Sequence, residues 1–130
     1  MRNLGMTEFE VVELINGLTS NIIANQALFV TILSAYLVVA YSVGDRLTKY
    51  QVAFINFMFV LFSLLGIQTV GGIMDIMTIY ALQYTEMRGI LSDANTVKVD
   101  AVRWGIVGVR LLLCAGALVF MWQVRHPKTE

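Results

Sequence analysis

The residue in this sequence that is best suited to carry chemistry is an arginine inside an apolar run. Arg110 lies between Ala101 and Gln123, a stretch that contains no acidic residue. As a helix, that stretch places Arg110 ~13 Å from its start. An arginine near the centre of a membrane helix costs ~2.5–3.5 kcal/mol on insertion scales. We therefore expect a polar partner or water beside it.

Polar residues in two other apolar runs have spacings that match this arginine. Arg103 precedes Arg110 by seven residues, and Gln68 precedes Asp75 by the same interval. If the two helices are antiparallel neighbours, Asp75 comes level with Arg103, and Gln68 with Arg110. The first apolar run adds asparagines at similar depth. The sequence thus predicts one polar cluster inside the membrane, formed by Asn21, Asn25, Gln68, Asp75, Arg103 and Arg110.

Two interpretations of this cluster compete. In the first it is a structural clamp, in which polar groups fix the helix contacts and the register of an oligomer. In the second it is an anion path or pore, with Arg103 and Arg110 facing water. The clamp is favoured, because one partner is enough for an arginine to be tolerated in a membrane.

Catalytic chemistry finds little support in the residue types. His126 is the one histidine and Cys114 the one cysteine. A histidine-based metal site is therefore excluded by number, and a Ser-His-Asp triad would need a histidine next to Pro127 in a short tail. No strand precedes a glycine-rich phosphate loop. We expect no enzymatic activity, no metal and no cofactor, and the zero net charge gives no reason to expect nucleic-acid binding.

Composition assigns these residues to a membrane protein. Hydrophobic residues make up 58% and charged residues 14% of the 130 residues, whereas soluble domains have ~45–50% and ~25%. No charge occurs from Leu14 to Gly44 or from Tyr50 to Met74, and a bilayer core needs ~20 helical residues. The sequence predicts an all-α integral membrane protein whose residues 1–130 form one transmembrane domain, with three transmembrane helices over about 7–43, 49–88 and 96–123.

The first two helices are expected to extend beyond the bilayer on the same side. Thr7 and Glu10 form a capping box well before the apolar core of the first run, and Gly44 is suited to end that helix as a C′ glycine. The segment from Ile73 to Tyr84 keeps the helical spacing of apolar residues but is too short to cross a bilayer. Both extensions carry apolar stripes, so we expect them to pack on each other or on copies in other subunits.

Aromatic and basic residues suggest how the helices sit in the membrane. Trp104 and Trp122 are separated by ~27 Å along a helix, close to the hydrocarbon thickness, and with Tyr50 they are predicted to be interface anchors. Basic residues are concentrated in the short link and in the C-terminal tail. By the positive-inside rule they favour an outside N-terminus and a cytoplasmic C-terminus in a bacterial inner membrane; these residues are Arg46, Lys49, Arg125 and Lys128.

Three functions fit these features. The first is a small non-catalytic membrane subunit whose partners are the lipid bilayer and either its own copies or other membrane subunits. The alternative is a homo-oligomeric channel or transporter with an arginine-lined anion path. In layout, three spans with an outside N-terminus and a cytoplasmic C-terminus are similar to one class of phage holins, a resemblance that implies a membrane-disrupting protein.

Overall fold

The protein folds as three long helices. The computed structural model describes the backbone of residues 5–88 and 94–126 and the side chains of residues 5–86 and 100–126. Helix α1 spans Glu8–Val43, α2 spans Lys49–Arg88 and α3 spans Ala94–Arg125. These bounds lie within two residues of the predicted ones. The described residues contain no strand, which confirms the all-α prediction.

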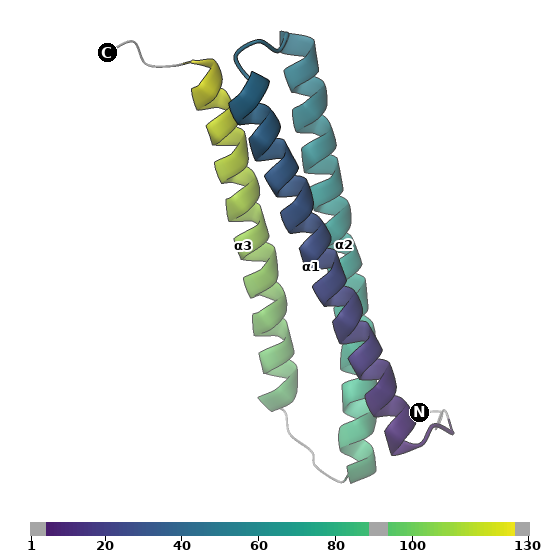
Figure 1. Cartoon of the computed structure of the whole chain (residues 1–130). Coiled ribbons are helices and arrows are strands. Elements are labelled where there is room, and N and C mark those ends of the chain that lie inside the picture. Colours follow the sequence, from purple (N-terminus) through teal and green to yellow (C-terminus); the bar gives the residue numbers. More distant parts are fainter. Residues whose placement is uncertain (1–4, 89–93, 127–130) are drawn as a thin grey trace.

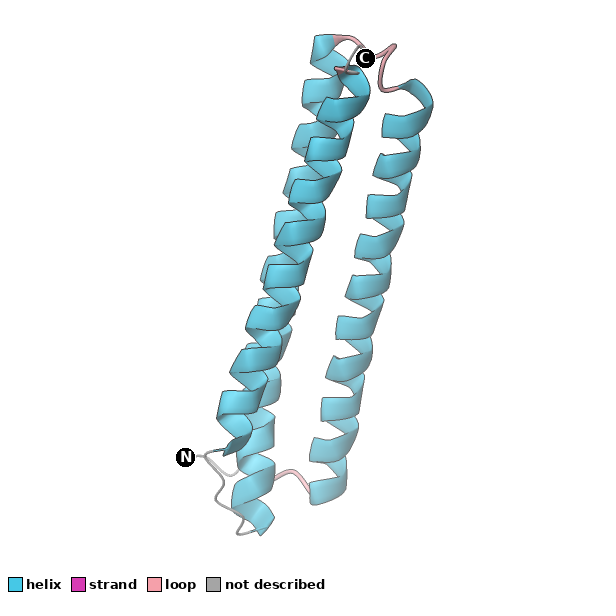
Figure 2. Cartoon of the chain, turned by 90° about the vertical axis from the view of Figure 1, so that its left-hand side faces the viewer, coloured by secondary structure: helices cyan, strands magenta, loops and turns pink. Residues whose placement is uncertain are grey.

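The helices form an antiparallel bundle in which each contacts the other two. Figure 1 shows α1 and α3 running in the same direction and α2 running back between the two ends. The start of α1 and the end of α2 therefore lie at one end of the bundle, and the end of α3 lies at the other. Figure 2 shows the same long bundle from the side.

Each helix contains a segment long and apolar enough to cross a membrane. The helices contain 36, 40 and 32 residues, which correspond to ~54, ~60 and ~48 Å at the helical rise. A hydrocarbon core is ~30 Å thick. Helices α1 and α2 therefore extend well beyond a single crossing, as the sequence predicts, and α3 is also longer than a crossing requires.

Side chains define the helix starts. At α1 the Thr7 hydroxyl accepts from the Glu10 N–H at 3.4 Å, and the Glu10 carboxylate accepts from the Thr7 N–H at 2.7 Å. The Thr7 hydroxyl also donates to the Glu10 carboxylate at 3.0 Å, and the two bonds that this carboxylate accepts lower the pKa of Glu10, because they stabilise its ionised form. At α2, Thr48 and Gln51 exchange the equivalent pair of bonds. The predicted capping box is therefore present at α1, and α2 begins with a second one.

The end of α1 differs from the prediction in its backbone conformation. Gly44 caps the helix but has right-handed φ and ψ values of −58° and −34°, so the expected left-handed C′ glycine is wrong. A side chain at this position would meet the Ala40 carbonyl and the Val124 side chain. Glycine is needed here because the chain passes close to these two groups.

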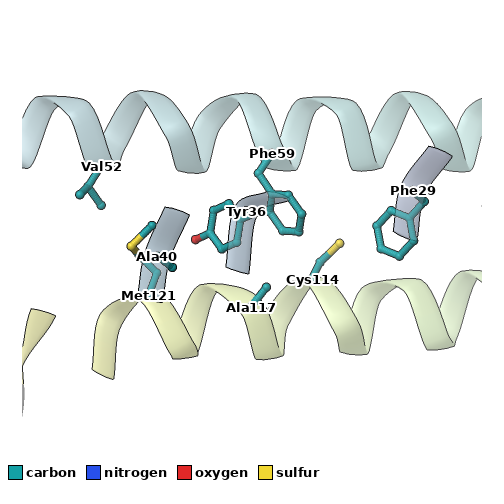
Figure 3. Close-up of a cluster of buried hydrophobic side chains, with 8 residues drawn as sticks. All are labelled: Phe29, Tyr36, Ala40, Val52, Phe59, Cys114, Ala117 and Met121. Atoms are coloured by element: carbon teal, nitrogen blue, oxygen red, sulfur yellow. The ribbon is translucent and has the colours of Figure 1, made fainter. Parts of the chain in front are cut away.

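An apolar cluster holds the three helices together in the half of the bundle near the α1–α2 link. Tyr36 stacks on Phe59 with ring centroids 4.3 Å apart, and the Tyr36 hydroxyl donates to Asn56 Oδ1 at 2.7 Å. Figure 3 shows the cluster drawing on all three helices; its buried members are Phe29, Tyr36, Ala40, Val52, Phe59, Cys114, Ala117 and Met121. The cluster fixes the positions of the helices on one side of the polar residues described next.

Candidate functional site

The guanidinium of Arg110 lies between the three helices. Arg110 is 3% exposed, the most buried charged side chain among the described residues. Its Nη2 donates to Asn25 Oδ1 at 3.1 Å and approaches the Asn25 carbonyl oxygen at 3.5 Å. Its Cζ lies 4.3 Å from the centroid of the Phe29 ring, a cation–π contact. Arg110 of α3 is thus held by two residues of α1 that are one helical turn apart.

Helix α2 makes room for the guanidinium with a glycine. A Cβ atom on Gly66 would lie 2.9 Å from both Nη1 and Nη2 of Arg110 and 3.0 Å from its Cζ, closer than real carbon contacts allow. Gly66 continues the inward-facing stripe of α2 that includes Phe59, Ser63 and Val70. From the sequence, Gly66 is recognised only as a small residue in a membrane helix. The pattern that could have identified its role is its position on the inward-facing stripe of α2, at the depth of Arg110.

Most of the hydrogen-bonding capacity of Arg110 is unused. A guanidinium has five N–H donors, one on Nε and two on each Nη atom. The Nε and Nη1 atoms are buried and have no hydrogen-bond partner, so three of the five donors are unpaired. Within the described part of the chain, the one polar group that holds Arg110 is the neutral amide residue Asn25. The positive charge therefore lacks a counter-charge.

A second polar contact lies closer to the end of the bundle. Arg103 Nη1 donates to Asp75 Oδ1 at 2.7 Å, as the antiparallel register predicts. The side chains of Arg103 and Asp75 are 37% and 63% exposed. Seven residues separate Arg103 from Arg110, or ~10 Å along the helix. This ion pair is therefore suited to the edge of the hydrocarbon core, with Arg110 inside it.

Two residues of the predicted cluster do not join it. Gln68 is exposed and has no hydrogen bond among the described residues. Gln68 lies seven residues from Asp75 and shares its outward face. Gly66 precedes Gln68 by two residues and therefore faces inward. Asn21 is also exposed. The structure thus divides the predicted cluster into an outer ion pair, Asp75–Arg103, and an inner arginine site.

The predicted interface anchors lie on the outside of the bundle. Tyr50, Trp104 and Trp122 are all largely exposed, so their rings are free to contact lipid. Trp122 also stacks on His126, with centroids 5.2 Å apart. Lys128, one of the residues used for the orientation, lies outside the described residues.

A small cavity adjoins the inner arginine site on the side between α1 and α2. Its volume is about 150 Å³, and Arg110, Asn25 and Gly66 form part of its wall. Leu28, Ile32, Phe62 and Leu65 are among its apolar lining residues. A guanidinium with apolar surroundings favours an anionic group such as a carboxylate. Among the described residues, no three histidine, cysteine or acidic side chains are grouped as metal ligands would be.

No protein-family model, curated protein or solved structure matches this chain.

Proposed function

We propose that this protein is a small non-catalytic membrane subunit that assembles through its helices into a homo-oligomer or a larger membrane complex. The observation that carries the proposal is exposed apolar surface beyond the expected bilayer core. Ile79 lies ~6 Å past the Asp75–Arg103 pair along α2 and is 61% exposed. Phe9 lies ~24 Å from Asn25 along α1 and is 74% exposed.

These side chains favour burial against protein. Within the same extensions Val11 is fully buried and Tyr80 and Tyr84 are half-buried, which supports packing of the extensions on each other. Phe9 and Ile79 are left outside that contact. Apolar groups that lie outside the hydrocarbon gain free energy when another protein surface covers them.

The inner arginine site supports a clamp over an open anion path. Arg110 is almost fully buried and bridges α3 to α1. Arg103 is engaged by Asp75. Because Arg110 is buried and Arg103 is paired within one chain, an arginine-lined channel would require a rearrangement in an oligomer.

Native mass spectrometry of protein purified gently from its own membrane tests the proposal. A mass that is a multiple of 14.5 kDa would indicate a homo-oligomer, and a mass that includes other chains would indicate a larger complex. A monomer under conditions that preserve known membrane complexes would contradict it. Phe9→Ser with Ile79→Ser should shift the population toward monomer, whereas the exposed mid-helix substitution Leu112→Ala should not.

Conductance measurements separate the clamp from the channel. In liposomes, Arg110→Leu should leave anion flux at background if the residue is a clamp, and should change conductance or selectivity if it lines a path. Growth arrest and membrane leakage on expression of the unmodified chain would instead favour the holin-like alternative.

For the orientation, we propose an outside N-terminus and a cytoplasmic C-terminus in a bacterial inner membrane, supported by the basic residues of the link and tail. In a Cys114→Ser background, a membrane-impermeant maleimide should label Glu13→Cys in intact cells. It should label Asp45→Cys only after lysis. The reverse pattern would show the opposite orientation.

A further inference from the structure

Among the described residues, no acidic side chain neutralises the buried positive charge of Arg110. Three of its N–H donors are unpaired, and its hydrogen-bond acceptor is an uncharged asparagine. The nearest intramembrane acid, Asp75, already contacts Arg103 about one heptad away along the bundle. A buried charge that has no opposite charge is costly in a low-dielectric medium.

Further copies of this chain have no acid with which to supply the missing charge. There is no Asp or Glu in residues 14–44, 46–74 or 101–129. Asp75 lies at one edge of the apolar spans and Asp45 at the other, whichever way a copy is inserted. Each is therefore distant in depth from Arg110. Homo-oligomerisation can cover apolar surface, but it leaves this guanidinium without a carboxylate.

The guanidinium of Arg110 borders the groove between α1 and α2, and its buried Nε and Nη1 atoms reach a partner in the groove when the guanidinium turns toward the cavity. On α2 the cavity of about 150 Å³ is lined by Ser63, Gly66 and Thr69, three small residues spaced three apart; Thr69 is exposed, whereas Ser63 and Gly66 face the bundle interior. Small residues let the backbone of a neighbouring membrane helix approach closely. The apolar members of the groove, Leu28 and Leu65, are about half exposed, so the groove faces outward from the bundle.

We propose that the groove between α1 and α2 receives a transmembrane helix of a different protein, and that an Asp or Glu of this helix pairs with Arg110. The inference rests on the proposed assembly function and specifies its partner: a membrane chain with one acid at the depth of Arg110. The partner carboxylate accepts from the unpaired guanidinium donors, and its apolar neighbours cover Leu28 and Leu65.

The test uses the full-length protein in liposomes and designed membrane peptides as probes. One peptide is a Leu-Ala helix with a single Glu at about one third of its length; its matched control carries Gln. Förster transfer between labelled protein and labelled peptide measures association. Intramembrane polar pairs contribute ~0.6–1.7 kcal/mol, so we expect the Glu peptide to associate about threefold to eighteenfold more tightly than the Gln peptide.

Two variants assign this preference to Arg110. Arg110→Gln should bind the two peptides equally. Because that variant removes a core contact, Asn25→Asp provides a second test that keeps the arginine. It places a carboxylate where Oδ1 lies 3.1 Å from Nη2, neutralises the guanidinium from within the chain, and should also abolish the preference for Glu.

Equal association of both peptides with the wild-type protein would overturn the proposal, as would a preference for Glu that persists in both variants. A gain in thermal stability of the wild type, but not of Asn25→Asp, with chloride or oleate alone would also overturn it and assign the site to a free anion. Native mass spectrometry reports assembly of any kind, whereas the Glu–Gln difference reports only the charge. Failure of this inference is therefore distinguishable from failure of the proposed function.

Discussion

Gly66 is the position at which the smallest chemical change most directly tests the inner arginine site. In Gly66→Ala the new Cβ would lie 2.9 Å from Nη1 and Nη2 of Arg110, whereas comfortable contacts between heavy atoms are ~3.5–4.0 Å. The guanidinium must therefore retreat by ~0.5–1 Å to reach such a contact. Its 3.1 Å bond to Asn25 and its contact with Phe29 would both be weakened.

The expected loss of stability follows from these contacts. The bond to Asn25 contributes ~0.6–1.7 kcal/mol in a membrane, and the cation–π contact ~0.5–2 kcal/mol. Alanine offsets up to ~1 kcal/mol of this loss through its higher helix propensity. Because the guanidinium can move toward the adjoining cavity, the clash is partly relieved. We expect a net loss of ~1–2 kcal/mol.

Equilibrium unfolding in mixed micelles, followed by circular dichroism, measures this loss. The matched control is Gly72→Ala on the same helix, where a Cβ meets nothing within 4 Å; it should be neutral or stabilising by up to ~1 kcal/mol. Repeating Gly66→Ala in an Arg110→Leu background should remove the penalty. Equal stability of the two alanine variants, or an unchanged penalty without Arg110, would refute the close approach that we describe.

Two further predictions concern the polar contacts nearer the bundle ends. Because the Asp75–Arg103 pair is partly exposed, Asp75→Ala should reduce the free energy of unfolding by only ~0.2–1 kcal/mol, and by less at high salt. The same unfolding assay measures this change. A reduction several times larger would place the pair inside the apolar core. At the start of α1, Thr7→Ala should cost ~1 kcal/mol of helix-end stability, read by hydrogen exchange of the first-turn amides. The bonds to Thr7 lower the pKa of Glu10 from 4.5. The stabilisation from the Glu10 carboxylate is therefore complete above pH 4.5 and is lost as the pH falls through the lowered pKa. Hydrogen-exchange protection of the first turn that does not change with acid would contradict this stabilisation.

The sequence predicts the depth in the membrane of each polar residue in the site. Along a helix, residue number converts directly to distance, so the matched seven-residue spacings were enough to place Asp75 opposite Arg103. Facing direction is harder to predict, because a shift of two residues moves a side chain to the other side of the helix. For that reason Gln68 was predicted beside Arg110, whereas the structure places Gly66 there.

The sequence by itself determines that this chain is a helical membrane protein with three crossings. Apolar runs longer than a bilayer core and polar caps at the helix starts are local properties, set by the hydrogen-bonding demand of the backbone in lipid. Tertiary structure alone decides which polar group each charge contacts, because that depends on the rotation of three helices about their axes. In this fold the rotation pairs Arg103 with an acid and leaves Arg110 held by Asn25 and Phe29, with no carboxylate beside its charge in the part of the chain that the structure describes.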